Sequence, residues 1–304
     1  MTFGRVAFNP LLFIAFIVSG ASAPAVADIT LPQANGATLS LSAPAKRIIT
    51  LAPNLAELVF AAGAGERLKA VVEYSNFPVQ VADIPRVGDA FRIDLERIIE
   101  LEPDLVIAWK SGNPQMALHK LEQLGMTVWQ VEITRPEEIA AVVENISVAA
   151  GTQTHGLSVA RHLQEKLEQL KQNNAGKATV EYFYQISARP LYTINGQHII
   201  SRSLEICGGH NIFSDLPTLA AQISRESVLL ADPQVMIAPR VHDEAAELGV
   251  WHEWPELQAV QNRTLLYLPA DEINQATPRL LDSIDLACKL LDEVRKPVQQ
   301  VEEK

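Results

Sequence analysis

The chain has 304 residues, of which 48% are hydrophobic and 20% charged, and its formal net charge is −11 at pH 7. This apolar content can fill one large or two medium cores, and it excludes an intrinsically disordered chain. Nucleic acid and anionic membrane surfaces are excluded as main partners, because phosphate binding needs clustered Lys and Arg and the sequence has no basic run.

The first 27 residues have the three regions of a secretory signal peptide. Arg5 precedes an apolar stretch at 11–18, and small residues follow it up to Ala25-Val26-Ala27. The apolar stretch is short for a membrane span, and an Ala-x-Ala cleavage site follows it. We therefore expect cleavage after Ala27 and export of the mature chain, with an uncleaved membrane anchor as the alternative.

Strand and helix patterns alternate along the first half of the mature chain, after a polar lead-in at 28–46. Asn54 is expected to cap the first helix, with Glu57 three residues later. Strands are predicted at 47–51, 68–73, 104–109 and 127–132, and helices from Pro53, over 114–124 and over 136–150. This alternation is typical of a parallel sheet covered by helices and predicts an α/β lobe over 47–152.

Residues 153–176 interrupt the alternation with one long amphipathic helix. Its apolar residues recur every three or four positions, at Leu157, Ala160, Leu163, Leu167 and Leu170. A helix is stiffer than a Gly- or Ser-rich linker, so we expect it to join two lobes and to limit hinge motion.

A second α/β lobe is predicted over 177–296, followed by a tail at 297–304. Its strands are expected at 179–184 and 265–268, and its helices at 201–207, 253–260 and 279–294.

The passage at 94–109 recurs at 224–239. Glu96 of the first copy matches Glu226 of the second, 130 positions later (96 to 226), and both copies break at an acidic residue followed by Pro. Each copy begins with helix-spaced apolar residues and ends in a short apolar run, as a buried strand does. The repeat predicts two similar lobes, and a ligand cleft between them.

Motifs of common enzymes are absent from the sequence. It has no glycine-rich phosphate loop, no His-Glu-x-x-His and no Cys-x-x-Cys, and its seven histidines are scattered rather than grouped as in a zinc site. We therefore expect a binding protein without a metal centre or catalytic residues, and an exported α/β enzyme is the alternative from another class.

Cys207 and Cys288 are the two cysteines of the chain. An exported protein meets an oxidising compartment, so a disulfide between them is predicted, with two buried free thiols as the alternative. Two distant cysteines supply too few ligands for a metal site.

Four stretches resemble the periplasmic iron/cobalamin-binding family, and together they cover about residues 46–292. They are RIITLAPNLAELVFAAGAG, the block RVGD to LERIIELEPDLVIAW, LEICGGHNIF and ATPRLLDSIDLACKLL. The resemblance implies two Rossmann-like lobes with parallel sheets joined by a long helix, a periplasmic location, a monomeric state, and delivery of a ligand to an ABC importer permease in the inner membrane. Within the family the chain resembles the cobalamin receptors, whose paired cysteines correspond to Cys207 and Cys288.

The resemblance to cobalamin receptors implies ligand-binding residues on both lobes. Tyr74 occupies the place of a loop aromatic that contacts the corrin, and Phe91 lies one place from another aromatic position. Trp109 follows a predicted strand at the carboxyl edge, where ligands bind in open α/β sheets, and its ring suits a corrin face; packing is its alternative. The matching segment of the second lobe consists of Asp271, Glu272, Ile273, Asn274 and Gln275.

The same resemblance implies that Glu96 and Glu226 dock the receptor on its transporter, since one surface Glu of each lobe does so in cobalamin receptors. Solvated surface positions are the alternative. The pair coincides with the internal repeat, which strengthens this interpretation.

Several positions depart from the cobalamin receptors, which carry aromatic residues where this chain has Ala90, 219–221 and 186–187. Fewer aromatics imply less stacking area or a differently shaped ligand. Haem is an alternative ligand, because Tyr74 could coordinate iron. A ferric siderophore is another, for which Arg92 and Lys110 would supply positive charge.

Overall fold

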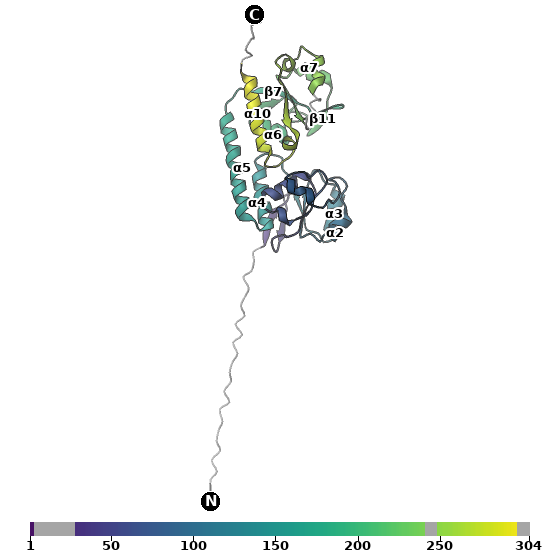
Figure 1. The fold of residues 1–304 in the computed structure, drawn as a ribbon, viewed down its shortest axis with the longest axis vertical. Helices are drawn as coiled ribbons and strands as arrows, with labels where there is room; N and C mark the ends of the chain where they lie inside the picture. Colours follow the sequence, from purple (N-terminus) through teal and green to yellow (C-terminus); the bar gives the residue numbers. More distant parts are fainter. Residues whose placement is uncertain (3–27, 241–247, 297–304) are drawn as a thin grey trace.

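The computed structural model describes residues 1–2, 28–240 and 248–296. Most of the predicted signal peptide and the tail 297–304 lie outside the described residues. Two lobes follow one another along the long axis of the molecule, and helix α5 (Gln153–Asn174) runs beside both of them (Figure 1). The predicted fold class, two α/β lobes joined by a long helix, is therefore confirmed. Within the described ranges, no helix is long and apolar enough to cross a membrane.

The first lobe is built on a four-stranded parallel sheet in the order β4-β3-β5-β6. Its strands are β3 (Ile48–Thr50), β4 (Leu68–Ala70), β5 (Leu105–Trp109) and β6 (Val128–Val131). Its helices are α1 (Pro53–Ala61), α2 (Leu95–Glu100), α3 (Gln115–Gln123) and α4 (Glu138–Ala150), with 3-10 turns η1 (Gly65–Arg67) and η2 (Val79–Asp83).

The second lobe has a parallel sheet in the order β10-β7-β12-β13 and a small antiparallel sheet in the order β11-β9-β8. The parallel strands are β7 (Val180–Tyr184), β10 (Gly209–Asn211), β12 (Val235–Arg240) and β13 (Leu265–Pro269). The antiparallel strands are β8 (Ser187–Ala188), β9 (Leu191–Ile194) and β11 (Ala220–Gln222). The helices are α6 (Ile199–Glu205), α7 (Arg225–Ala231), α8 (Gln258–Gln261), α9 (Ala270–Ile273) and α10 (Leu280–Arg295), with the 3-10 turn η3 (Leu248–Glu253).

Both parallel sheets have the same strand order, since the second strand of each lobe lies beside the first, and the third lies on the first strand's other side. From its first strand, each sheet therefore grows first to one side and then to the other. The direction of growth reverses between β3 and β5 in the first lobe and between β7 and β12 in the second. Ligands of open parallel sheets bind outside the carboxyl ends of the strands at such a reversal. The topology thus places a candidate site on each lobe.

The two copies of the repeated passage fold alike, as predicted. Asp94 accepts a hydrogen bond from the backbone N–H of Arg97 at 3.0 Å, and Ser224 accepts one from Ser227 at 3.2 Å. Each pair caps a short helix, α2 or α7, in which the fourth helical residue is fully buried, and each helix leads to the third strand of its lobe.

The segment 28–46 is more than a polar lead-in. It contains an antiparallel hairpin of β1 (Ile29–Pro32) and β2 (Thr38–Leu41), whose Leu31 is fully buried in the core of the first lobe. Trp129 anchors it by donating its Nε1–H to the carbonyl oxygen of Pro32 at 2.8 Å. Two four-residue strands are too short to give a clear alternating pattern in the sequence.

The prediction that Asn54 caps α1 is wrong. The N-cap is Ala52, and no side chain bonds to the first turn. Pro53 occupies the first helical position, where its missing N–H and its fixed φ suit the start of a helix. Asn54 therefore has a side-chain amide that the helix does not use.

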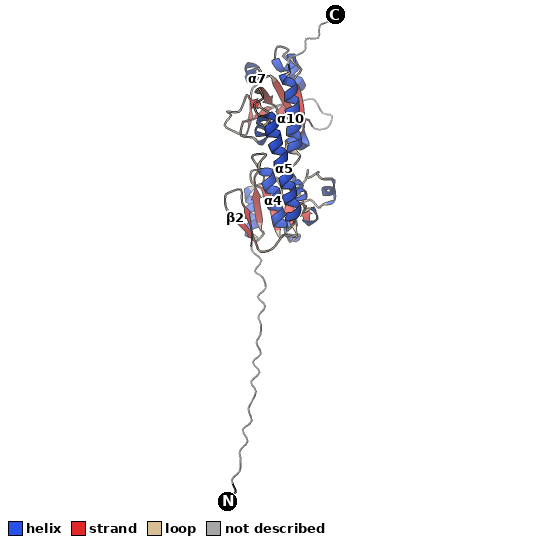
Figure 2. Cartoon of the chain, turned by 90° about the vertical axis from the view of Figure 1, so that its left-hand side faces the viewer, coloured by secondary structure: helices blue, strands red, loops and turns tan. Residues whose placement is uncertain are grey.

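Helix α5 is tied to both lobes. Lys171 pairs with Glu137 of the first lobe at 2.7 Å, and Lys166 pairs with Asp282 of α10. In the view of Figure 2, α10, α5 and α4 follow one another down the middle of the face turned to the viewer. Such contacts with both lobes favour a linker that holds the lobes in a defined orientation.

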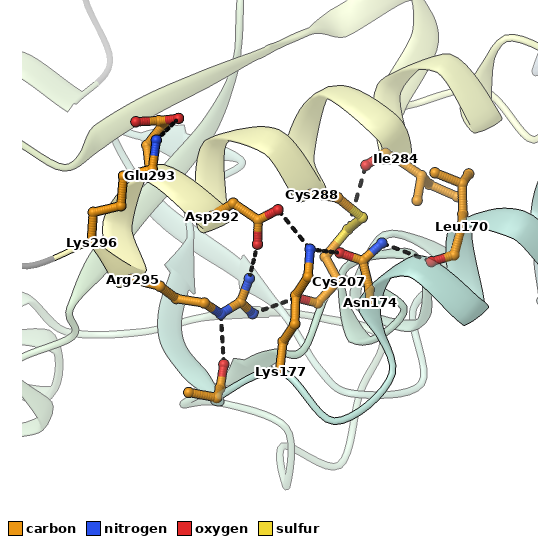
Figure 3. A network of polar contacts seen from close by, with 11 residues as sticks. Leu170, Asn174, Lys177, Cys207, Ile284, Cys288, Asp292, Glu293, Arg295 and Lys296 are labelled. Carbon is orange, nitrogen blue, oxygen red and sulfur yellow. Dashed lines mark hydrogen bonds and ion pairs between the residues drawn. A yellow bond between two sulfur atoms is a disulfide. The ribbon is translucent and has the colours of Figure 1, made fainter.

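The predicted disulfide is confirmed. Cys207 is bonded to Cys288 of α10, with an S–S distance of 2.01 Å. Around it, Asp292 accepts from Lys177 at 2.6 Å and from Arg295 at 2.8 Å (Figure 3). The disulfide and this charged cluster together fix the last helix to the lobe.

Candidate functional site

A cavity of about 270 Å³ lies between the two lobes. Its walls include Trp109, at the end of β5, on the first lobe, and His198, just before α6, on the second. The complete lining is Asn54, Trp109, Ser111, Glu132, Ile133, Thr134, Gln197, His198, Ile199, Leu219, Asn274, Gln275 and Ala276. The cavity thus lies beside the carboxyl end of β5, at the reversal of strand order, as parallel sheets favour.

Trp109 is held by its own loop. Its backbone N–H donates to Asn113 Oδ1 at 2.7 Å, and Asn113 Nδ2 donates to the carbonyl oxygen of Leu51 at 2.7 Å. Gly112 lies against the indole, since a Cβ built there would be 2.8 Å from Trp109 Cδ1. The half-buried indole is therefore fixed in place at the wall of the cavity.

A second cavity of about 120 Å³ adjoins the first, and Gln275 lines both. Tyr74 and Asp271 also line it, so the structure brings together three residues that the sequence assigned to opposite sides of one site. The Tyr74 side chain is 77% exposed, and its φ of 65° puts the backbone in the left-handed region that non-glycine residues seldom adopt. Arg86 stabilises this loop by donating Nη2 to the carbonyl oxygen of Ser75 at 3.1 Å.

Arg279 connects the lobes across the second cavity. Its Nη2 donates to Glu57 Oε2 at 2.7 Å, and its Nε donates to both carboxylate oxygens of Glu57 at 3.1 Å. The guanidinium carbon lies 4.0 Å from the centroid of the Phe77 ring, in the same loop as Tyr74. Burial opposes the charge on Arg279, but the hydrogen bonds and charge of Glu57 outweigh it and raise the pKa of Arg279.

The segment 271–275 is only partly available to a ligand. Asp271 and Asn274 are exposed, whereas the carboxyl of Glu272 is partly buried, and this burial, followed by the charge of Asp282, raises its pKa. Ile273 departs from our expectation. Its side chain is fully buried in the main hydrophobic cluster, because the single turn of α9 points it inward, so it contributes to packing rather than to the cavity wall.

Phe91 is not brought together with the other predicted site residues. It is 77% exposed and lines neither interlobe cavity, and its backbone N–H bonds to Asp89 Oδ1 at 2.7 Å in a tight loop. Lys110, considered for an anionic siderophore, donates its Nζ to the carbonyl oxygen of Ala34 at 2.9 Å, away from the cavities. Over the described part of the chain, no group of three His, Cys, Asp or Glu residues could hold a metal ion.

Among the polar side chains that line the cavity at Trp109, those of Gln197 and His198 were missed by sequence reasoning, Asn54 was expected only as a helix cap, and Asn274 and Gln275 were predicted. Asn54, Gln197, His198, Asn274 and Gln275 line it, and among the described residues only the His198 ring has a side-chain hydrogen bond, at Nδ1. Burial lowers the pKa of His198, which favours the neutral ring. Nothing in the sequence marks Gln197 or His198 as ligand-binding, because neither belongs to a motif.

A larger recess of about 770 Å³ near the end of α5 is also lined by residues of both lobes, and it shares Gln197 with the cavity at Trp109. Its lining is mostly charged, polar or small and contains no aromatic side chain. Lys171 already pairs there with Glu137, and Lys177 with Asp292. These two cations are paired within the protein, so the cavities at Trp109 and Tyr74 are the better candidate for a ligand site.

Glu96 and Glu226 occupy equivalent places on the outer surface of the two lobes. Each is exposed and is the second residue of its short helix, α2 or α7. The carboxylate of Glu226 accepts hydrogen bonds from the backbone N–H of Glu226 and from the Ser224 side chain, and these bonds lower its pKa. Both positions therefore present an accessible carboxylate.

The sequence matches the profile of the periplasmic binding protein family over residues 48–272. The "Vitamin B12-binding protein" of Vibrio cholerae serotype O1 (strain ATCC 39541) is 39% identical over 254 residues, which cover 83% of this chain and 91% of the relative. The protein of the same name from Photorhabdus laumondii is 33% identical over 84% of this chain and 90% of the relative.

Solved structures agree with this similarity. The crystal structure of the periplasmic vitamin B12 binding protein of Vibrio cholerae superposes with a TM-score of 0.79 at 38% identity, over 84% of this chain and 99% of that one. A periplasmic heme-binding protein from Roseiflexus has a TM-score of 0.71 at 18% identity, over 82% of this chain and 99% of that one, and so shares the fold.

Proposed function

Because the chain belongs to the periplasmic binding protein family, we propose that it captures cobalamin or a related corrinoid between its lobes. The relatives of 33–39% identity that are named for vitamin B12 binding support this ligand. The observation that carries the proposal is the interlobe cavity, whose walls combine a fixed indole with several polar side chains that make no side-chain hydrogen bond to the described part of the protein.

The chemistry of the cavity suits a corrinoid. A corrin has broad apolar faces and a rim of amide groups, so it needs flat or aliphatic surface together with hydrogen-bonding side chains. The flat or aliphatic surface comes from Trp109, Ile199 and Leu219. The hydrogen-bonding side chains include the amides of Asn274 and Gln275. A ligand that spans both cavities would contact Trp109 and Tyr74 at once. Such binding requires no chemical change of the ligand.

Delivery to an ABC importer in the inner membrane completes the proposal. Glu96 and Glu226 would dock the two lobes on the permease, because their exposed carboxylates lie at equivalent places of both lobes. We further propose a monomer exported to the periplasm through a signal peptide over 1–27, with lobes over 47–152 and 177–296.

Incubation of the purified protein with cyanocobalamin tests the ligand. We expect a red chromophore that stays with the protein through gel filtration and a saturable calorimetric signal at a stoichiometry of one. Protein that emerges colourless and gives no heat of binding contradicts the proposal.

Haem is the second candidate, since the exposed Tyr74 hydroxyl lies at the lip of the cleft and haem-binding proteins share the fold. Haemin added to the same sample would then give a Soret band shifted by tyrosine coordination, and Tyr74→Phe would abolish the shift. If the protein binds cyanocobalamin and does not shift the Soret band of haemin, the ligand is a corrinoid. If the protein shifts the Soret band and does not bind cyanocobalamin, the ligand is haem.

A further inference from the structure

Asn54 is a mostly buried polar residue whose side chain makes no hydrogen bond to another described residue. Only 9% of its surface is exposed, it lines the interlobe cavity from α1, and its amide bonds to no other described residue. Over the described residues, the enclosed side-chain atoms that lack a partner do not include those of Asn54, so its amide is open to the cavity, where water or a ligand can bond to it. Asn54 is therefore a group whose partner is expected to come from the cavity.

His198 faces the same cavity from the opposite lobe. Its Nδ1 accepts the backbone N–H of Ile200 at 3.2 Å, so this nitrogen carries a lone pair and not a proton. In the neutral ring the proton then lies on Nε2, and Nε2 has no partner among the residues that the structure describes. His198 is thereby fixed as a hydrogen-bond donor, and a metal bond through Nε2 is disfavoured, since that nitrogen holds the proton.

We infer that Asn54 and His198, one from each lobe, are specificity-determining residues that hydrogen-bond to oxygen atoms of the bound ligand. This inference rests on the proposed function. His198 offers one donor, and Asn54 offers both a donor and an acceptor, so their common partner chemistry is an amide or phosphate oxygen. A corrinoid carries amide oxygens on its rim, and cobalamin has in addition the phosphate of its nucleotide loop.

Two conservative substitutions test this assignment. Asn54→Leu keeps the volume and removes the amide, and His198→Asn keeps an acceptor for the Ile200 N–H but loses the Nε2 donor. We expect each variant to bind cyanocobalamin about 3- to 10-fold more weakly, as the loss of one hydrogen bond predicts. His162→Phe, at an exposed position of α5, is the matched control and should bind like the wild type.

Dicyanocobinamide, which lacks the nucleotide loop, identifies the oxygen. Equal losses for both ligands assign a rim amide, whereas a loss for cyanocobalamin alone assigns the phosphate. Wild-type affinity of both variants for both ligands overturns the inference while leaving the proposed function intact. Wild-type protein that binds neither corrinoid contradicts the proposed function itself.

Two measurements without ligand separate this assignment from a structural one. The unfolding free energy of Asn54→Leu should stay close to that of the wild type, because the amide faces the cavity and makes no hydrogen bond to another described residue. The ¹⁵N chemical shifts of the His198 ring should show a protonated Nε2. A clear loss of stability in Asn54→Leu, or a proton on Nδ1, overturns the inference.

Discussion

Arg279 of the second lobe and Glu57 of the first form an ion pair across the cleft, with Arg279 Nη2 2.7 Å from Glu57 Oε2. The Glu57 side chain is only 6% exposed and that of Arg279 is 22% exposed. The same guanidinium contacts the Phe77 ring, so one residue joins the start of α10 to the middle of α1 and to the Tyr74 loop. The ion pair therefore links the relative position of the two lobes to the position of the Tyr74 loop, which lines the second cavity.

Loss of Arg279 should destabilise the protein. Arg279→Ala leaves the carboxylate of Glu57 buried without its partner, and we expect the unfolding free energy to fall by about 2–3 kcal/mol in urea titrations. Arg97→Ala is the control, because its pair with Glu100 is 48% and 65% exposed and should contribute less than about 1 kcal/mol. Equal effects of the two variants would contradict an interlobe contribution.

Gly112→Ala should weaken ligand binding without changing the residues that line the cavity. A Cβ at this position would lie 2.8 Å from Trp109 Cδ1, so the indole has to move. We expect at least a 10-fold rise in the Kd for cyanocobalamin by calorimetry, since the ring offers the largest flat surface in the cavity. Gly36→Ala is a control for the cost of a methyl group, because nothing lies within 4 Å there, although its φ of 85° adds some strain. Unchanged affinity of Gly112→Ala would mean that Trp109 does not contact the ligand.

Transport should depend on Glu96 and Glu226 together. The double variant to Ala is expected to abolish uptake with the cognate permease while cyanocobalamin binding stays at the wild-type level, because both carboxylates are remote from the cavities. Each single variant should retain partial uptake. Glu100→Ala combined with Glu165→Ala removes two other exposed carboxylates and should leave uptake unchanged. Normal uptake by the Glu96/Glu226 variant would refute the docking assignment.

Removal of the disulfide should lower stability strongly. Cys207 and Cys288 close a loop with a sequence separation of 81, and the loss of such a crosslink costs about 4 kcal/mol on the chain-entropy model. Cys207→Ser with Cys288→Ser should therefore unfold at a much lower urea concentration than the oxidised wild type. Reduced wild type should match the double variant, and a variant as stable as the oxidised wild type would contradict this prediction.

Stability should fall on mild acidification because of His198. Burial lowers its pKa in the folded state, whereas the unfolded chain has the ordinary value of about 6.5. Between these two values the unfolded state binds more protons, so the unfolding free energy decreases as the pH falls from above 6.5 towards the folded pKa. The unfolding free energies of the wild type and of His198→Asn should be measured from pH 7.5 to 5. The wild type should lose more of its unfolding free energy over this range than the variant. Parallel pH profiles of the two proteins would exclude it.

Much of the architecture was predictable because it depends on local patterns. The alternating strands and helices, the linker helix and the repeated helix-to-strand unit with Glu96 and Glu226 all follow from apolar periodicity and capping residues. The site was predictable in part. Tyr74, Asp271 and Gln275 meet at one cavity as the family resemblance implied, whereas Phe91 lies apart from it and Ile273 is buried.

Periodicity and the count of cysteines are properties of the chain, so the two lobes, their connection and a disulfide could be predicted from the sequence, with free thiols as the alternative to the disulfide. Only the tertiary structure decided what the isolated side chains do. It turned Asn54 from an expected helix cap into a group of the cavity wall, gave Glu57 its partner 222 positions away, and set the tautomer of His198. The reason is physical: hydrogen bonds and ion pairs are made by atoms within about 3 Å of each other, and across a cleft those distances depend on how the lobes pack.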